Sequence, residues 1–406
     1  MIDKNPYLKS NILLKNFKKN RSINQLSKKF EKIFLDIKKE INQDNKTLNI
    51  LNSKFKFNFK TKDLNKFKKF KNIVLIGMGG SILGAEAIHS FFKEKIKKKV
   101  YFFNNLDEDK IANLKKNGNL SKFLFIIISK SGNTIETLSN TFYLNIIKNN
   151  AKNIILISEK KNNHLFSLSK KFNLFYVEHK NFIGGRFSVL SDAGVLPAYL
   201  MGINIKRLRS KIFDCLKKKN KTSLKNNVIK LAILNDSKKY NNLIFLNYSR
   251  ELEKFLYWSQ QLIAESLGKK SKGFLPVISN VPKDHHSLLQ LYLDGPKDKI
   301  FYIFHIEKKL KEKININKNL KIKSFLNKKK LHVIKNAQRL ALMKSLIKRK
   351  IPLREFQIKN ANEETLGKLF TYFIIETIIL GRLLNINPFN QPAVEQVKVN
   401  TKKLLS

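Results

Sequence analysis

Cysteine is almost absent from this sequence, since Cys215 is the single cysteine among 406 residues. An intramolecular disulfide needs two cysteines, so no such bond can cross-link the fold. This usage is typical of proteins from a reducing compartment. We therefore expect a cytoplasmic protein whose stability comes from packed cores.

The sequence also has no hydrophobic run long enough to cross a membrane. Its longest apolar stretches are Phe123–Ile128 and Leu369–Leu380, and the second is interrupted by Glu376. A spanning helix needs about 20 apolar residues. The first residues, MIDKNPYLKSN, lack the basic and then apolar pattern of a secretory signal. We expect no membrane partner.

Acidic residues are scarce: 30 Asp and Glu stand against 81 Lys and Arg, which gives a formal charge of +51. Such a charge is typical of proteins that bind nucleic acids or anionic membranes. The lysines are nevertheless spread along the chain, for example at Lys97–Lys99 and Lys217–Lys219, and mark no basic helix with interleaved aromatics. We attribute the composition to an AT-rich genome and expect no specific nucleic-acid partner. A positive field would still attract phosphorylated substrates.

What the sequence does contain is an alternation of short apolar runs with longer helical patterns. The predicted strands are Asn72–Ile76, Phe123–Ile128, Asn153–Ile157, Asn173–Val177, Asn242–Asn247 and Phe301–His305. The predicted helices are Ile82–Phe92, Thr134–Ile147, Glu251–Leu267 and Asn362–Leu384. This rhythm predicts an α/β protein with doubly wound parallel sheets in a three-layer αβα arrangement.

The length favours two domains of ordinary size. We expect a helical segment over 1–50, a first α/β domain over 51–210, a second over 211–385, and a C-terminal helical arm over 386–406 that carries Lys398. The stretch Lys308–Lys330 is charged and has no apolar face, so we expect a surface insertion there.

A glycine-rich junction follows the first predicted strand and reads GMGGSILG over residues 77–84. Glycines allow positive φ and a close approach to a ligand, and the next helix offers free N–H groups to an anion. The spacing is not the G-x-G-x-x-G of dinucleotide sites. Gly80 and Ser81 are candidate phosphate ligands, although the glycines could serve tight packing alone.

A second junction, SKSGNTIET over residues 129–137, follows the next strong strand. Ser129, Ser131 and Thr134 supply hydroxyl groups at a helix start, where they could cap the helix or bind phosphate. The segment resembles the phosphosugar loop of the sugar-isomerase (SIS) domain family. That family includes isomerases, aminotransferase subunits and regulators that only bind, so the resemblance implies a ligand class and not a reaction.

Two charged side chains further along are candidates for chemistry. Two glycines precede Arg186, which suggests a bent backbone that delivers a guanidinium into a cleft; alternatively, Arg186 pairs with nearby Asp192. Glu265 lies off the apolar stripe of its predicted helix and shares a face with Gln261. A glutamate in such a position is usually a solvated surface residue.

Two polar segments complete the set. The Asp-His-His sequence at 284–286 could bind metal, but no second Cys or His cluster completes such a site, and a histidine in proton transfer fits better. Gln391, Glu395 and Lys398 are spaced i, i+4, i+7 on a predicted helix that starts near Pro392. They could equally form an ordinary surface pair.

Taken together, four segments resemble the glucose-6-phosphate isomerase family, in its short bacterial branch. They are GGRFSV at 184–189, ESLGK at 265–269, DHHSLLQ at 284–290 and NPFNQPAVEQVK at 387–398. The likeness extends from about Asn72 to Leu405. It implies two sugar-isomerase domains, a homodimer, and the reversible conversion of glucose 6-phosphate to fructose 6-phosphate through an enediolate.

The resemblance also implies roles for residues. Glu265 would move the proton between C1 and C2, and Arg186 would stabilise the enediolate. His286, contributed across the dimer, would act in ring opening, with Lys398 beside the ring oxygen. The residues implied in substrate binding are Gly80, Ser81, Ser129, Lys130, Ser131, Thr134, Gln261 and Gln391. No cofactor and no metal is required.

Three positions depart from the family pattern. Asn390 stands where the family usually has Asp, and Ala393 and Val397 stand where it has Gly. Val397 is adjacent to Lys398, so it could alter the approach of that helix to the sugar. Two alternatives remain: an isomerase that also accepts mannose 6-phosphate, and a noncatalytic phosphosugar-binding regulator.

Overall fold

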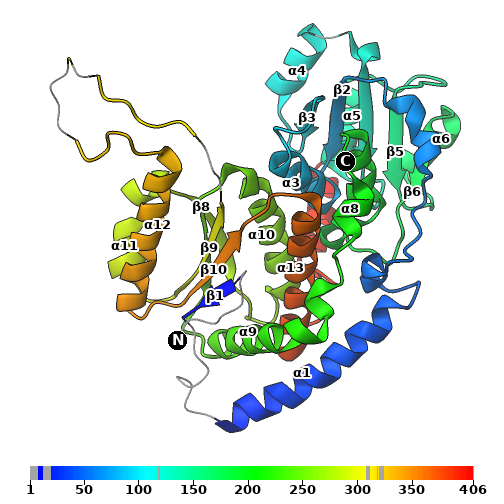
Figure 1. Cartoon of the computed structure of the whole chain (residues 1–406). Helices are drawn as coiled ribbons and strands as arrows, with labels where there is room; N and C mark the ends of the chain where they lie inside the picture. The colour runs from blue at the N-terminus through cyan, green and yellow to red at the C-terminus, as the bar shows by residue number, and fades with distance from the viewer. Residues whose placement is uncertain are drawn as a thin grey trace.

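Two five-stranded sheets with helices on their faces make up the architecture of the computed structural model (Figure 1). It describes residues 8–11, 20–117, 119–307, 311–317, 319 and 324–405. The predicted fold class, α/β with two parallel-sheet units, is confirmed. The exact limits of the two domains stay a prediction.

The first sheet is wholly parallel and has the strand order β3-β2-β4-β5-β6. Its strands are β2 (Asn72–Gly77), β3 (Lys99–Phe103), β4 (Phe123–Ile128), β5 (Ile154–Ser158) and β6 (Phe175–Glu178). Four of them match predicted strands. The sequence pattern does not predict β3, because this edge strand buries only Phe103 fully and begins with an exposed lysine.

Alternate residues of these strands face two different cores, as a three-layer arrangement requires. Leu75, Leu124 and Ile126 face a core shared with helix α7 (Asp192–Leu200). Val74 and Phe125 face the opposite core. That face is covered by α4 (Glu108–Asn117), α5 (Ile135–Tyr143) and α6 (His164–Lys171).

The second sheet repeats the same topology. Its strands are β7 (Asn242–Asn247), β8 (Leu275–Asn280), β9 (Lys299–Ile306) and β10 (Leu353–Ile358), with β1 (Leu8–Ser10) at one edge. In the order β1-β10-β9-β7-β8, β7 lies second from the edge, between β8 and β9, just as β2 lies between β3 and β4 in the first sheet. This shared winding shows that the two halves are related in architecture.

The edge strand β1 is an addition that no sequence pattern predicts. It pairs antiparallel with β10, whereas the other pairings of this sheet are parallel. The Asn11 side chain continues the contact, since its Nδ2 donates to Ile351 O at 2.8 Å and its Oδ1 accepts from Leu353 N at 2.8 Å. A strand of three residues is too short to show a periodic pattern.

Helices complete both cores. The remaining α-helices are α1 (Asn20–Ile41), α2 (Thr61–Leu64), α3 (Leu83–Phe91), α8 (Ile205–Arg209), α9 (Lys218–Asp236), α10 (Glu253–Leu267), α11 (Leu289–Asp294), α12 (Leu331–Lys348), α13 (Glu363–Leu383) and α14 (Ala393–Leu405). The 3-10 turns are η2 (Thr47–Leu51), η3 (Asn65–Phe67), η4 (Gly79–Ser81), η5 (Leu120–Lys122), η6 (Gly185–Leu190), η7 (Asp214–Leu216), η8 (Arg250–Leu252) and η9 (Lys283–His286). Helix α3 packs along α10, which joins the two halves at their central helices.

One large core fills the space between the halves. It includes Phe245 and Phe304 of the second sheet, Phe255 and Trp258 of α10, and Phe370 of α13, all buried. Several of these aromatic rings stack or meet edge to face, as do Trp258 and Phe370 with centroids 4.8 Å apart. The helices and strands that carry the candidate residues are therefore held by a continuous hydrophobic interior.

The sequence predicts two surface segments, the Lys308–Lys330 insertion and the C-terminal arm. The Lys308–Lys330 insertion lies partly outside the described residues, and its described positions are mostly exposed. Helix α14 forms the expected C-terminal arm, and every described residue of it is exposed. No helix in the described part of the chain has both the length and the hydrophobicity needed to traverse a bilayer.

Candidate active site

The two predicted phosphate loops lie next to each other at the carboxyl edge of the first sheet. Strands β2 and β4 are direct neighbours, and β2 is also the strand on whose two sides the chain winds in opposite directions. Ligands of open α/β sheets bind outside the carboxyl ends of the strands at such a reversal point. The loop after β2 and the loop after β4 therefore meet where the fold favours a ligand.

The glycine loop after β2 packs against the backbone that carries Arg186. A Cβ atom on Gly80 would lie 2.1 Å from the carbonyl carbon of Gly185, so no side chain fits there. Gly79 has φ +50°, and a Cβ on it would lie 2.8 Å from Nε2 of Gln261. The glycines thus serve close packing, and this packing brings the loop, Arg186 and Gln261 together.

The loop after β4 turns its hydroxyl groups toward one another. Ser129 Oγ lies 2.8 Å from Thr134 Oγ1 and 3.5 Å from Ser131 Oγ. Thr134 is the N-cap of α5, but its side chain makes no capping hydrogen bond. Helix capping therefore does not explain the hydroxyl of Thr134, which stays with Ser129 in a cluster suited to an anion.

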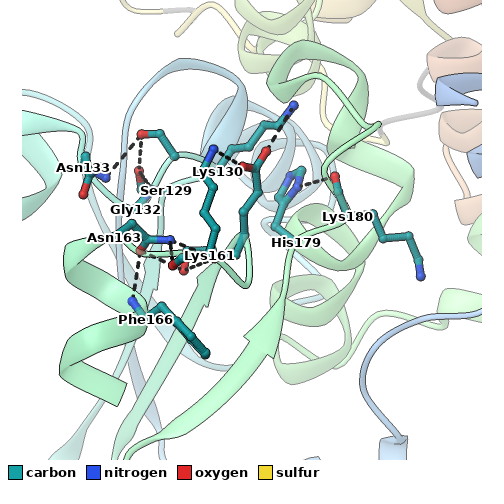
Figure 2. A network of polar contacts seen from close by, with 12 residues as sticks. Ser129, Lys130, Gly132, Asn133, Lys161, Asn163, Phe166, His179 and Lys180 are labelled. Carbon is teal, nitrogen blue, oxygen red and sulfur yellow. Dashed lines mark hydrogen bonds and ion pairs between the residues drawn. The ribbon is translucent and has the colours of Figure 1, made fainter. Parts of the chain in front are cut away.

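Helix α6 fixes the outer side of this loop (Figure 2). Gly132 has φ +69°, and a Cβ on it would collide with the Asn163 side chain at 1.7 Å. Asn133 Oδ1 accepts from the backbone N–H of His164 at 3.0 Å and lies 2.8 Å from His164 Nδ1. These contacts set the shape of the loop before any ligand arrives.

Arg186 is buried, with 2% of its side chain exposed, and binds two segments that are distant in the sequence. Its Nε donates to Ser266 Oγ at 2.8 Å, and NH2 donates to Pro388 O at 2.7 Å and to Asn390 O at 3.2 Å. NH1 donates to Glu265 Oε2 at 3.1 Å and to Gln391 Oε1. Burial lowers the pKa of the guanidinium, and the charge of Glu265 opposes that effect.

The alternative partner of Arg186, Asp192, lies elsewhere. Asp192 Oδ1 accepts from the backbone N–H of Asn58 at 2.6 Å. Burial raises the pKa of this carboxyl to about 6. The expectation that Asp192 pairs with Arg186 is wrong, because Asp192 opens α7 and its carboxylate binds the backbone of Asn58 instead.

Glu265 keeps a partly open carboxylate at the end of α10. Oε1 accepts from Gln261 Nε2 at 2.9 Å, and 27% of the side chain is exposed. Two hydrogen-bond donors thus hold the carboxylate while solvent, and so a substrate, can still reach it. The alternative of a merely solvated surface glutamate does not fit these contacts.

Lys269, the last residue of the ESLGK segment, also joins this cluster, although no sequence pattern marks it as a candidate. Its Nζ donates to Glu265 O at 3.0 Å and to Asn390 O at 2.6 Å. Burial, and then the charge of Arg186, lower the pKa of Lys269 to about 8, against the effect of Glu265. Lys269 therefore ties the α10 end to the segment that carries Gln391.

The structure distinguishes the two adjacent histidines. His285 Nε2 lies 3.0 Å from the Tyr248 hydroxyl, and burial, then the charge of His286, lower the pKa of His285. His286 is exposed, and its side chain makes no hydrogen bond to any described residue. Among the described residues, no group of three His, Cys, Asp or Glu side chains could hold a metal ion.

Lys398 does not join the cluster around Glu265. Its side chain is 59% exposed, and Nζ lies 3.4 Å from Glu395 Oε2 on the same helix. The expected common face of Gln391, Glu395 and Lys398 is wrong for Gln391, because α14 begins at Ala393 and Gln391 lies before it, bonded to Arg186. Val397 is 66% exposed, so it packs against neither loop.

Comparisons with known proteins agree on one family. The family model described as phosphoglucose isomerase matches residues 16–406. Glucose-6-phosphate isomerase of Methanocaldococcus jannaschii is 33% identical over 363 residues, which cover 83% of this chain and 85% of that protein. The enzyme of the same name from Campylobacter jejuni is 32% identical over 351 residues, or 83% of this chain and 86% of that one.

A solved structure extends the likeness to the fold. The crystal structure of a hypothetical protein from Thermus thermophilus is 25% identical and superposes with a TM-score of 0.82. The match covers 100% of both chains. The arrangement of the whole chain is therefore shared with a known protein.

Proposed function

Because the chain belongs to the phosphoglucose isomerase family and catalyses the interconversion of glucose 6-phosphate and fructose 6-phosphate, we propose that Glu265 and Arg186 carry out its chemistry. The observation that carries this proposal is the contact of Arg186 NH1 with Glu265 Oε2 at 3.1 Å. It joins a buried cation to a partly exposed carboxylate beside the two phosphate loops. We find no support for the alternative of a noncatalytic regulator.

In the proposed mechanism, Glu265 acts as the base that moves one proton. In the open-chain sugar, the carboxylate removes the proton from C2 of glucose 6-phosphate, the C2–H electrons form a C1–C2 double bond, and the π electrons of the C1 carbonyl move to O1, which gives an enediolate. The hydroxyl proton of O2 then passes to O1, the C2 carbonyl forms, and the C1–C2 π electrons take the same proton back from Glu265 at C1, which gives fructose 6-phosphate. The carboxylate suits this shuttle because Gln261 and Arg186 fix it while 27% of its side chain stays exposed.

Arg186 is proposed to stabilise the enediolate oxygens. Its guanidinium is fixed by Ser266, Pro388 and Asn390 before the substrate binds. A cation held in a buried position needs little reorganisation when negative charge develops nearby. Gln391 bonds the same guanidinium and is proposed, with Gln261, to bind sugar hydroxyls.

A coupled assay tests the reaction directly. Purified protein is given fructose 6-phosphate, with a metal chelator present, and the glucose 6-phosphate formed is measured. We expect turnover that survives the chelator. No turnover in a folded protein that still binds the phosphosugar would contradict the assignment.

The hydroxyl cluster is proposed to bind the substrate phosphate, together with Ser81 and the backbone N–H groups of Gly80 and Lys130. Replacing Ser131 by alanine removes one donor to a dianion, a bond worth about 1.5–3 kcal/mol. We expect KM for fructose 6-phosphate to rise about tenfold or more, with kcat changed by less than about threefold. Steady-state kinetics measures both values.

The matched control is Ser121→Ala, at an exposed serine beside the opposite end of β4. It should leave KM unchanged. An unchanged KM in Ser131→Ala would count against the phosphate cradle.

We further propose a cytoplasmic homodimer in which His286 of one subunit completes the site of the other. His286 is exposed and about 20 residues beyond Glu265 in the chain, after β8, so it is available to a partner. In the same assembly, Lys398 on the exposed arm α14 would approach the ring oxygen. His286 would then transfer a proton in ring opening.

Mixing two inactive variants tests the shared site. Glu265→Gln and His286→Ala homodimers each lack one group in both sites. Subunit exchange makes hybrids in which one site carries both changes and the other neither, so we expect about a quarter of wild-type activity to return, from the symmetry of a two-fold dimer. Activity that stays at the level of the unmixed variants would contradict the shared site.

A further inference from the structure

Glu159 has a buried carboxylate next to the phosphosugar loop, and this carboxylate takes no part in the mechanism above. Glu159 comes directly after β5, and Lys130 lies just after the end of the neighbouring strand β4. The Glu159 N–H donates to Lys130 O at 3.0 Å. The backbone therefore fixes the two residues side by side before their side chains are considered.

The side chains then form an ion-pair cluster (Figure 2). Lys130 Nζ lies 3.6 Å from Glu159 Oε1, and Lys161 Nζ contacts Oε2. Only 9% of the Glu159 side chain and 31% of the Lys130 side chain is exposed, against 58% for Lys161. Lys130 is thus the inner partner of Glu159, and Lys161 is the outer one.

Lys130 depends on Glu159 because its other charged neighbours are cations. Burial lowers the pKa of Lys130, the Glu159 carboxylate raises it, and Lys161 and Arg186 lower it further. Without the negative charge of Glu159, a partly buried ammonium would face repulsion alone.

His179 lies on the other side of this cluster, and its ring is uncharged. Its Nδ1 donates to Lys180 O at 3.0 Å, and 2% of the residue is exposed. Burial lowers the pKa of His179 to about 4, so the ring is neutral at neutral pH. It therefore supplies no negative charge that could replace that of Glu159 beside Lys130, and it does not compete with Lys130 as a cation.

We propose that Glu159 is a positioning residue that holds the Lys130 ammonium beside the phosphosugar loop, where it adds a fixed positive charge for the phosphorylated substrate. The inference rests on the proposed function of this loop. Glu159 touches no substrate itself and acts through Lys130. Because the phosphate charge is the same in substrate and transition state, the ammonium contributes to binding in both and affects KM more than kcat.

The test is a double-mutant cycle on Glu159 and Lys130. We expect Glu159→Gln to raise KM for fructose 6-phosphate at least about fivefold, with kcat within about twofold of wild type. Lys130→Met should raise KM similarly. The double variant should be no worse than Lys130→Met alone, because Glu159 has nothing left to position.

Lys161→Met is the matched control. It removes the exposed partner of the same carboxylate and should leave KM within about twofold of wild type. A structural role of Glu159 would instead lower stability and activity in the double variant as well. Should Glu159→Gln fail to fold, the double variant, which removes both charges together, still provides the comparison with Lys130→Met.

Two results would overturn the inference: wild-type KM in Glu159→Gln, or fully additive effects in the double variant. Titration calorimetry with inorganic phosphate gives the same comparison without turnover. We expect the phosphate Kd to follow the pattern of KM across the four variants. A wild-type protein without isomerase activity would refute the proposed function, while the phosphate series would still test Glu159.

Discussion

Glu265→Gln should lower kcat at least about 100-fold while the protein folds and binds phosphate as before, because this exchange removes only the group that accepts a proton. Glutamine has the same shape, and its amide oxygen can still accept from Arg186 or Gln261. The geometry around α10 is therefore retained. Turnover, thermal unfolding and inorganic phosphate binding are measured on the same preparation.

Glu253→Gln provides the control on the same helix. Glu253 is the first residue of α10, and its Oε1 accepts from Asn280 Nδ2 at 3.1 Å. We expect this variant to keep wild-type kcat. Nearly normal turnover in Glu265→Gln would remove Glu265 as the base and leave the reaction to another group of the site.

Arg186→Lys should have the second large effect, on both stability and activity. Arg186 donates to Ser266, Glu265 and Pro388 from three different nitrogens. A lysine keeps the positive charge, but its single nitrogen cannot make these three hydrogen bonds at the same time. We expect the free energy of unfolding to fall by about 2–4 kcal/mol, because buried acceptors lose their donors. We expect kcat to fall at least about 100-fold, as when a fixed donor to a developing oxyanion is lost.

Denaturant unfolding and steady-state kinetics measure the two effects separately. Arg349→Lys, at an exposed arginine after α12, is the control and should change neither. An Arg186→Lys variant of reduced stability but wild-type kcat would mean that the arginine is a structural anchor only. The proposed stabilisation of the enediolate would then be wrong.

The sequence predicts those strands and loops whose residues form a continuous apolar or polar run. Phe123–Ile128 is apolar at every position because both of its faces are buried, and it is a strand as predicted. The polar run after it forms the predicted loop, because short hydroxyl side chains and Gly132 suit a tight turn before a helix. The sequence does not predict edge strand β3, because most of its residues are only partly buried and so form no continuous apolar run.

The contacts that build the site are not local, and no single segment reveals them. Arg186 binds the carbonyl oxygen of Pro388, 202 residues further along the chain. Two of its partners, Pro388 and Asn390, offer backbone carbonyls, which every residue possesses, so no residue type marks these contacts. Lys269 escapes prediction for the same reason, since its shortest contact is with the carbonyl of Asn390.

Periodicity also misleads where a helix boundary is assumed. The spacing of Gln391 and Lys398 predicts one face only if the helix includes both residues. The chain turns at Pro392 before α14 begins, so Gln391 points to Arg186 while Lys398 stays on the exposed arm. In the described chain, Lys398 Nζ therefore contacts Glu395 of its own helix and not the Glu265 carboxylate.

Strand β1 has a consequence for the order in which the molecule is completed. Asn11 bonds to Ile351, which is 340 residues away in the sequence. The β1 segment therefore leaves the ribosome long before its partner strand β10 is synthesised. Until β10 is made, the early segment has no partner, and closing so long a loop is slow. Once β10 is made, its outer edge stays open to pairing with another molecule until β1 arrives. During synthesis the outer edge of β10 is therefore open to pairing with another molecule, and this interval ends when β1 pairs with β10.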